Sequence, residues 1–511
     1  MKIGGNPEFK NMSEVADVNR SRTRLGLMAQ QVWRSAALMT LFNTSAKVCS
    51  LGLILPFILN RFSEGDYALY QLLSLIITLQ MLVGAGFVPT FARFIAHALS
   101  GMPEDQLGKL QVGTNEVQHH LEADADLFSR IIGTLRRIFL VLSALSLPIV
   151  GLVGFFLLDK PVRESSTPAN SWMAWGIVAC VTPLTLYASQ FSAILQGANK
   201  IAAEQRWSAI FTIAGTLLAL SSLAFGGTLL VLIAVNQLLQ VVSFCRLYWL
   251  ASHTLKALPY ASPDDRYCPK VFHAIWPNSW RSLTGVISAA GVMAASGLAF
   301  AQIMDSGPLA EFLLGLRIMQ VVGEVSRAPF YSQLPILNRL RVKGEIDKLR
   351  SLVRRNMIRS HIGYIILFGV APVASLVVLP LIHSKVAFPD MEFWIVLGLA
   401  AFVERWGAMH LQTYSTTNHI IWHWVNGYTG ILWVSLMMVL APVIGIYAYP
   451  IGLLAANCLI YSRVAARRSI ASLGCTFWEF ERRCSLPAFV VFFMCCGCLW
   501  LIRGLVYRTS L

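Results

Sequence analysis

The most constraining feature of this sequence is a series of twelve apolar stretches, each close to the length that crosses a membrane. A helix needs about 20 apolar residues to span the hydrocarbon core of a bilayer. A thirteenth apolar run, Leu486 to Ile502, is either a further span or a helix at the membrane surface. The twelve stretches lie at 36–59, 68–92, 137–158, 172–195, 208–225, 228–250, 274–303, 309–335, 358–382, 393–414, 421–441 and 443–462.

The composition of the chain agrees with a membrane protein and excludes several other classes. Of the 511 residues, 56% are hydrophobic and only 13% are charged. Disordered chains and coiled coils need more charge, and secreted disulfide scaffolds need denser cysteine. The sequence therefore predicts an all-α polytopic membrane protein with about twelve transmembrane helices, or thirteen to fourteen if the last apolar run also spans.

The basic residues indicate how the helices are oriented. They gather in the N-terminal segment and in the connections after every second span, whereas the other connections hold only Arg61, Lys160, Arg163 and Lys385. By the positive-inside rule, the N-terminus and the even-numbered connections are cytoplasmic. The net charge of +15 then points to anionic lipid headgroups rather than to nucleic acid. The polar N-terminus lacks the pattern of a cleaved signal peptide.

The chain divides into two halves of six spans. We expect a cytoplasmic N-terminal segment at 1–35, an N-lobe at 36–251, a cytoplasmic linker at 252–272, a C-lobe at 273–465 and a C-terminal segment with the extra apolar helix at 466–511. A long charged connection follows the second helix of each half. Because six is even, both halves enter the bilayer in the same direction. This is typical of transporters built from parallel repeats, which are related by a pseudo-two-fold axis along the membrane normal.

The residues of greatest functional interest are charges inside the predicted spans, because such charges normally face a water-filled cavity or a partner. Four of the polar residues in 309–335, namely Arg317, Gln320, Glu324 and Arg327, share one face of a helix because they are spaced 3, 4 and 3 residues apart. An alternative is that these residues only form ion pairs that pin helices together. The intramembrane charges selected as candidates are Lys47, Arg281, Arg317, Arg327 and Arg405, with Glu311, Glu324 and Glu404.

The first helices of the two halves each carry a cation. Lys47 lies four residues after Asn43, so both share a face of the first helix, and Arg281 lies near the start of the seventh. The two cations could face one another across a central cavity, although snorkelling to the cytoplasmic interface explains Arg281 equally well. An excess of cations in such a cavity predicts an anionic ligand, because a guanidinium forms bidentate bonds to phosphate.

Three residues are candidates for coupling to an ion gradient. Glu324, Glu404 and His410 carry groups that can titrate during a transport cycle. The chain has no nucleotide-binding, metalloprotease or nucleophile-elbow motif, and its ten cysteines are not accompanied by histidines at ligand spacing. We therefore expect a transporter rather than an enzyme, with no metal or other cofactor, driven by an H⁺ or Na⁺ gradient, the membrane potential or the substrate gradient.

Four short segments resemble polysaccharide repeat-unit flippases of the Wzx type, which belong to the multidrug/oligosaccharidyl-lipid/polysaccharide (MOP) exporter superfamily. The segments are Leu55–Ser63 followed by Tyr67–Gln71, Leu195–Lys200, Trp280–Ser282 and Glu404–His410. The resemblance implies that the chain transfers an undecaprenyl-pyrophosphate-linked oligosaccharide, such as an O-antigen repeat unit, across the bacterial inner membrane by alternating access. The cationic lumen of that family would correspond here to Lys47, Arg281, Arg317, Arg327 and Arg405.

The resemblance also implies partners for the protein, and it leaves alternative functions open. The ligand's lipid tail would stay in the bilayer, and a polysaccharide polymerase or other assembly proteins are candidate partners. Twelve-helix members lack the apolar run 486–502, whereas lipid II flippases of the same superfamily have fourteen helices. One alternative is an ion-coupled drug/cation antiporter of the multidrug and toxin extrusion (MATE) group, whose cavity should be acidic. Another is a non-transporting scaffold of a glycan assembly complex.

Overall fold

The computed structural model describes residues 33, 35–99, 125–257, 267–417, 419 and 421–509, and these residues form helices without any strand. The predicted N-terminal segment, most of the first long connection and residues 258–266 of the predicted linker lie outside this part of the chain. The first half consists of α2 (Ala36–Arg61), α3 (Glu64–Leu99), α4 (Ala125–Arg163), α5 (Pro168–Gly197), α6 (Ile201–Ala224) and α7 (Leu229–Ala257).

The second half has the same number of crossing elements, two of which are interrupted by π-helical turns. Its helices are α8 (Pro269–Val286), η2 (Ile287–Gly291), α9 (Val292–Ile303), α10 (Ser306–Tyr331), α11 (Leu334–Val342), α12 (Ile346–Leu381), α13 (Met391–Ser415), α14 (Trp422–Ile444), η3 (Gly445–Tyr447), α15 (Ala448–Ala456), η4 (Asn457–Tyr461) and α16 (Ser462–Ser472). Two further helices, α17 (Phe477–Glu481) and α18 (Ser485–Thr509), follow. The prediction of an all-helical membrane fold is confirmed.

Eight helical segments in the described part of the chain are long and apolar enough to cross a membrane by length and composition alone. The segments that fall short include α10 and α13, which carry the predicted intramembrane charges: Arg317, Glu324 and Arg327 on α10, and Glu404 and Arg405 on α13. The same charges that mark these helices as functional therefore lower their hydropathy. One of the eight segments, Trp422–Ser472, contains both α14 and the interrupted helix α15–α16.

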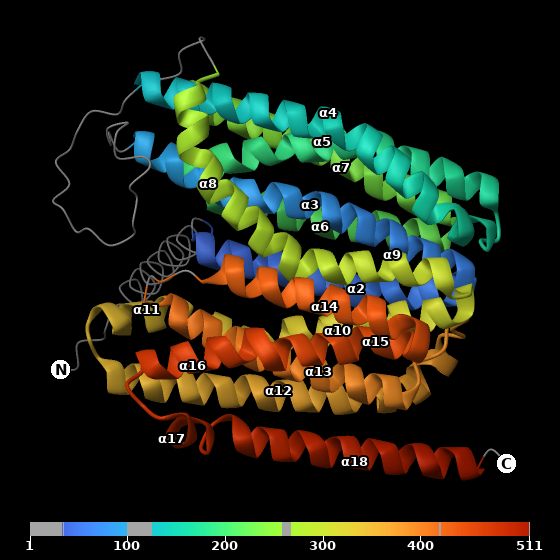
Figure 1. Cartoon of the computed structure of the whole chain (residues 1–511). Coiled ribbons are helices and arrows are strands. Elements are labelled where there is room, and N and C mark those ends of the chain that lie inside the picture. The colour runs from blue at the N-terminus through green and yellow to red at the C-terminus, as the bar shows by residue number, and fades with distance from the viewer. Residues whose placement is uncertain are drawn as a thin grey trace, which may run out of the picture.

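The two halves use the same helix pairings, as a structural repeat requires. In the first half, α2 packs on α6, α3 on α4, and α5 on α7. The equivalent pairs of the second half, α8 with α14, α10 with α12, and α13 with α16, also pack together. Figure 1 shows the result as two stacked groups of roughly parallel helices, α3 to α7 in one and α10, α12, α13, α15 and α16 in the other.

The interrupted helix α8–α9 links the two lobes. It follows α7 in the chain and packs on α14, yet it also lies against α3 and α4 of the first half. In Figure 1 α8 crosses the neighbouring helices obliquely. The π-helical turn η2 lies between its two parts, and such turns bend helices locally.

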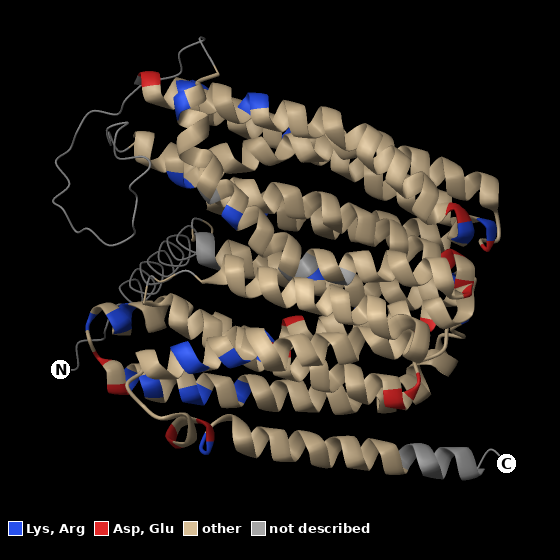
Figure 2. Cartoon of the chain, in the orientation of Figure 1, with Lys and Arg blue, Asp and Glu red and all other residues tan. Residues whose placement is uncertain are grey.

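The two ends of the bundle differ in charge. Figure 2 places most of the basic residues of the second half toward the end where α12 begins and α16 ends. The opposite end holds the acidic residues Glu64, Asp66, Asp159, Glu164, Asp305, Asp390 and Glu392 beside the four cations of the odd-numbered connections. The positive-inside rule therefore predicts that the first end faces the cytoplasm, and on that prediction we call it the cytoplasmic end. We call the other end the extracytoplasmic end.

The lobes are joined by hydrogen bonds at the extracytoplasmic end. Asn60 Nδ2 at the end of α2 donates to the carbonyl of Ile382 over 2.6 Å, and Lys385 Nζ donates to the carbonyl of Arg61 over 3.2 Å. Lys160 Nζ on α4 donates to the carbonyl of Met304 over 2.6 Å. The largest apolar core also crosses between the lobes here, with Tyr67 and Phe312 among its members. We call the polar contacts the extracytoplasmic latch.

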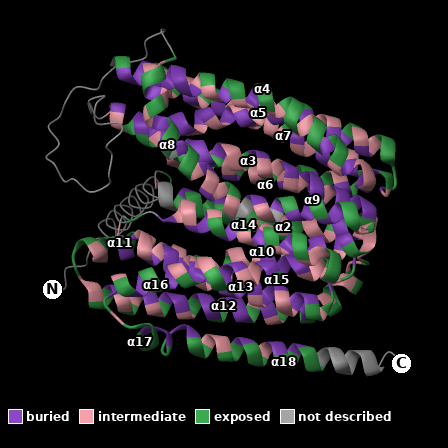
Figure 3. Cartoon of the chain, viewed as in Figure 1, coloured by how far each residue is buried: buried purple, intermediate pink, exposed green. Residues whose placement is uncertain are grey.

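The C-terminal apolar run forms a helix beside the second lobe. Helix α18 packs on α12 and α13, and Figure 1 shows it running along the bundle rather than across its end. Phe492 is fully buried against Phe402 and Phe368, with ring centroids 4.9 and 5.0 Å away. The outward face of α18, including Phe493 and Met494, is exposed. Figure 3 shows that exposed residues are common on the outer surfaces of the bundle. The part of α18 at Ser485–Leu501 is apolar but shorter than the segments that qualify as candidate membrane spans.

Candidate functional site

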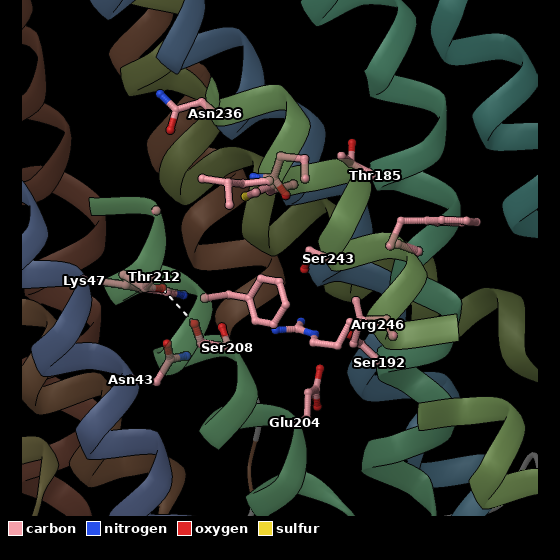
Figure 4. A pocket seen from close by; sticks show the side chains of 18 of the residues that line it. Asn43, Lys47, Thr185, Ser192, Glu204, Ser208, Thr212, Asn236, Ser243 and Arg246 are labelled. Atoms are coloured by element: carbon pink, nitrogen blue, oxygen red, sulfur yellow. Dashed lines mark hydrogen bonds between the residues drawn. The ribbon is translucent and has the colours of Figure 1, made fainter. Parts of the chain in front are cut away.

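A polar cavity of about 500 Å³ lies inside the first lobe, enclosed by α2, α3, α5, α6 and α7. Its lining runs from Glu204, in the first turn of α6, to Thr185 and Asn236 deeper in the bundle. Because α6 begins and α7 ends on the cytoplasmic side, the cavity extends from the cytoplasmic end of the lobe to beyond its middle, at Thr216 and Asn236. We call it the N-lobe cavity, and Figure 4 shows its lining side chains.

Three charged side chains line the N-lobe cavity. Arg246 on α7 and Glu204 on α6 project toward each other in Figure 4, and Lys47 projects from α2. Glu204 is buried and interacts electrostatically with both cations, but none of the three forms a salt bridge within the described residues. The Arg246 guanidinium lies 5.0 Å from the centre of the Phe211 ring. The cavity therefore carries two cations against one carboxylate.

Several buried polar atoms of the cavity have no hydrogen-bond partner within the described residues. They are Nε and Nη1 of Arg246, Oε2 of Glu204, Oδ1 of Asn43 and Nε2 of Gln80. Buried polar groups are normally satisfied by protein, water or ligand, so an unpartnered cluster of this kind marks a place where water or a ligand binds. Both donors and acceptors are available in this one cavity.

Uncharged amide and hydroxyl groups supply most of the remaining polarity of the cavity. Asn43 Nδ2 donates to Gln205 Oε1 over 2.7 Å, and Thr216 Oγ1 donates to Ser50 Oγ over 2.7 Å, so these groups are held in place by contacts between α2 and α6. Further groups of this kind come from four helices: Gln80, Ser189, Ser192, Ser208, Thr212, Asn236, Gln240 and Ser243.

The predicted cations of the second half lie outside the N-lobe cavity. Arg317 Nη1 on α10 donates to Gln320 Oε1 over 2.7 Å, and Arg317 interacts electrostatically with Tyr67 and Tyr70 of α3. It therefore lies where the two lobes meet. Glu311, near the start of α10, lies close to the acidic residues Glu64 and Asp390 at the extracytoplasmic end.

Arg327, Glu324, Glu404 and Arg405 belong to a second polar cluster inside the C-lobe. Arg327 pairs with Glu324 one turn away, and Arg405 is 8% exposed and packs against α10 at Gly323. A Cβ atom at Gly323 would lie 3.3 Å from Nη2 of Arg405, so the glycine makes room for the guanidinium. Glu404 and Arg405 both interact electrostatically with Tyr331.

Arg281 takes a different position from the other predicted residues. Its side chain is exposed on α8 and interacts electrostatically with His423 at the start of α14. It does not line the N-lobe cavity, whereas Lys47 and Asn43 do. The structure thus distributes the predicted set over four places: the N-lobe cavity, the junction between lobes, the interior of the C-lobe and, for Arg281, the exposed surface of α8.

His410 has a partner that the sequence did not indicate. Its Nε2 lies 2.8 Å from Oε1 of Glu481, and both side chains are fully buried. Trp406 Nε1 donates to the same oxygen over 3.4 Å, and the buried His361 contacts Ser485 nearby. Burial raises the pKa of Glu481, but the hydrogen bond and charge of His410, together with hydrogen bonds from Ser485 and Trp406, lower it below its ordinary value.

Sequence reasoning missed Glu204, Arg246, His361 and Glu481. Glu204 falls just before the window 208–225, and Glu481 lies in a polar segment that reads as a connection. Arg246 and His361 could have been found, because both lie inside predicted spans. The resemblance motif Leu195–Lys200 forms the tight turn between α5 and α6, with Asn199 at φ 56° and Gly197 closely packed against Ile95.

Comparison with known proteins gives a fold but no sequence relative: no family model and no curated protein matches the chain. The structure is similar to that of the MATE multidrug transporter DinF-BH, with 16% identity, a TM-score of 0.57, and coverage of 87% of this chain and 97% of that chain.

Two conformations of a multidrug resistance MATE family transporter of the MOP superfamily also match. The inward-facing one has a TM-score of 0.58 and the outward-facing one 0.52, each with 10% identity and coverage of 86% of this chain and 98% of the other. The chain therefore has the two-lobe, twelve-helix fold of the MATE transporters, with α18 added.

Proposed function

We propose that this protein is a transporter that moves an undecaprenyl-pyrophosphate-linked oligosaccharide from the cytoplasmic to the periplasmic leaflet by alternating access of its two lobes. The observation that carries the proposal is the lining of the N-lobe cavity, where Lys47 and Arg246 outnumber Glu204 among many amide and hydroxyl groups. The two-lobe fold supports a transport role, because the solved structures that share it are those of transporters.

The charges of the cavity suit an anionic group attached to a polar ligand. Unsatisfied N–H groups of Arg246 can donate to phosphate oxygens, and a guanidinium does so with two parallel bonds. Lys47 supplies a second positive charge from the neighbouring α2. Glu204 favours release, because it competes with the ligand for the same cations.

The uncharged lining suits a glycan. Sugars present many hydroxyl groups, which pair with amide and hydroxyl side chains that act as both donors and acceptors. The cavity offers such groups on α2, α3, α5, α6 and α7. A cavity of about 500 Å³ accommodates a few sugar units, and longer glycans would extend toward the cytoplasmic opening.

The arrangement of the lobes fits the first step of such a cycle. The extracytoplasmic latch joins the lobes at one end, and the N-lobe cavity extends from the cytoplasmic end of its lobe to beyond the middle. The similarity to the inward-facing MATE structure agrees with this state. A ligand from the cytoplasmic leaflet would enter with its polar head in the cavity and its tail in the bilayer.

A drug/cation antiporter is the second candidate, because Glu204 places a buried carboxylate in the cavity and the fold is shared with multidrug transporters. In that function the carboxylate binds the ligand or the coupling proton, and the two cations oppose the ligand. The candidates therefore make opposite predictions for Glu204 and Arg246.

The deciding experiment is complementation of a bacterial strain that lacks its own repeat-unit flippase, with surface polysaccharide as the readout. Wild type and Glu204→Gln are expected to restore polysaccharide, and Arg246→Ala to reduce it at least tenfold through loss of charge-assisted bonds to pyrophosphate. Lys256→Ala, an exposed cation on the same helix α7, is the matched control and should behave as wild type.

Complementation fails if the glycan of the host strain is not the one that this transporter carries. Binding to the purified protein is therefore measured as well. Undecaprenyl pyrophosphate and a cationic rhodamine dye are titrated against wild type, Arg246→Ala and Glu204→Gln. The flippase proposal expects pyrophosphate binding that Arg246→Ala weakens. Binding of the cationic dye alone, weakened by Glu204→Gln and not by Arg246→Ala, would replace the proposal by the antiporter.

A further inference from the structure

A second cavity of about 490 Å³ lies at the outer surface of the C-lobe, near its cytoplasmic end. Trp406 of α13, Ala466 and Ile470 of α16 and Phe477 of α17 give it apolar walls, and Arg463 and Arg467 of α16 lie at its edge. None of its lining residues belongs to the N-lobe cavity. We call it the C-lobe groove.

The wall formed by α17 is held firmly in place. Gly474, at φ 65°, reverses the chain after α16, and Thr476 and Glu479 form a capping box at the start of α17. Phe480 is buried, and Glu481 binds His410 of α13. The groove is therefore part of the fold, because buried contacts fix the short helix that closes it.

The two arginines of the groove are not neutralised by the protein. Arg463 and Arg467 are exposed, lie four residues apart on one face of α16, and have no acidic partner within the described residues. The carboxylates nearby in the chain are engaged elsewhere: Glu479 accepts from the backbone N–H of Thr476, and Glu481 pairs with His410. The edge of the groove thus presents two free guanidinium groups.

The position of the groove along the membrane matches the headgroup region of one leaflet. The two arginines lie between the apolar helix α15 and the cytoplasmic end of α16 at Ser472. Trp478 on α17 is 68% exposed and Phe477 is 43% exposed, as expected for aromatic side chains at a membrane interface. An apolar wall thus continues from a cationic edge toward the bilayer interior.

We propose that the C-lobe groove binds an anionic phospholipid of the cytoplasmic leaflet, with its phosphate on Arg463 and Arg467 and an acyl chain against Trp406 and Ile470. The charge of the edge selects an anionic headgroup, and the apolar walls accept a chain rather than a second polar group. This inference is independent of the transported substrate. The bound lipid would fill the space between α16, α13 and α17.

The test is a direct count of bound lipid. Purified full-length protein in detergent is mixed with phosphatidylglycerol or phosphatidylcholine of identical acyl chains, and binding is measured by native mass spectrometry. Wild type should prefer phosphatidylglycerol. The double variant Arg463→Ala/Arg467→Ala should bind it roughly thirtyfold more weakly, because two charges near the headgroup are lost.

Two further variants separate a built site from general attraction to a basic surface. Arg339→Ala/Lys343→Ala removes two exposed cations at the end of α11, away from the groove, and should leave binding unchanged. Ala471→Trp fills the groove from its exposed edge while keeping both arginines, and should abolish tight binding.

Three results would overturn the proposal: equal losses in the two double variants, equal binding of both lipids by wild type, or unchanged binding by Ala471→Trp. A lipid-free dimer that dissociates in Arg463→Ala/Arg467→Ala would instead show that a second copy of the chain covers the groove.

Discussion

At the scale of single residues, the same residue type has different roles depending on what faces it. Arg317 bonds to the neutral Gln320 and faces the other lobe, so its charge is available to a ligand. Arg327 pairs with Glu324 on its own helix, so its charge is largely compensated. We therefore expect Arg317 to interact with a ligand and Arg327 to act as half of an ion pair.

Replacement of these two arginines should separate transport from stability. Arg317→Ala is expected to reduce export at least tenfold while the folded protein keeps its melting temperature, because no carboxylate loses its partner. Arg327→Ala should lower the free energy of unfolding by about 1–3 kcal/mol, because Glu324 is left without its cation. Surface polysaccharide and fluorescence-detected melting measure the two effects. Normal export by Arg317→Ala would remove it from the transport path.

The Glu481–His410 pair predicts an acid-sensitive element of stability. Burial raises the pKa of Glu481, but the hydrogen bond and charge of His410, with hydrogen bonds from Ser485 and Trp406, together lower it from its ordinary value. The pair therefore contributes stability above the unfolded-state pKa, and this contribution is lost as the pH falls through the lower folded-state pKa. Glu481→Gln should cost about 1–3 kcal/mol at neutral pH and flatten the acid limb of a melting-temperature profile.

Glu479→Gln is the matched control for this pH profile. Its side chain is exposed, and glutamine keeps the capping bond to Thr476. An unchanged acid limb in Glu481→Gln, or an equal change in both variants, would show that other groups govern the pH dependence.

At the scale of helices, the apolar stretches of the sequence were sufficient to predict the helical architecture. Each predicted stretch corresponds to one helix or to a helix interrupted by a short turn, because about 20 apolar residues can satisfy their backbone only as a helix in a bilayer. The site was harder to predict. Hydropathy does not reveal which helix faces meet, so Lys47 and Arg246 could not be joined in one cavity, and Glu481 carries no signal in a short polar segment.

Helix α18 shows how van der Waals packing stabilises a membrane protein where no apolar surface is removed from water. Both lipid and protein are apolar, so helices associate in membranes through close van der Waals contact. Phe492→Ala should therefore cost about 1–3 kcal/mol by leaving a cavity among Phe402, Phe368 and Tyr364. Phe493→Ala, 55% exposed on the same helix, is the control and should change little. Equal melting temperatures for the two variants would show that α18 is only loosely attached.

At the scale of the whole molecule, the lobes are joined at one end by contacts that the proposed transport cycle must break. The extracytoplasmic latch consists of few side-chain bonds, mainly from Asn60, Lys160 and Lys385 to backbone carbonyls of the other lobe or its neighbouring loop. Each such bond contributes about 1 kcal/mol. Closure is thus set by a small free energy, which ligand binding can overcome.

Weakening the latch should therefore shift the population of states without unfolding the protein. Asn60→Ala/Lys160→Ala removes the hydrogen bonds to Ile382 and Met304 and also the ion pair between Lys160 and Asp305. The two hydrogen bonds alone correspond to a shift of roughly thirtyfold toward opening at the extracytoplasmic end. Spin labels at positions 163 and 383, on exposed residues of opposite lobes, report the distance across that end. The wild type should show one short distance and the variant an added longer one.

Ser166→Ala removes a bond to Asp66 within one lobe at the same end, so it controls for local loosening. If both variants keep the wild-type distance, the apolar core between Tyr67 and Phe312 rather than the polar latch holds the lobes closed.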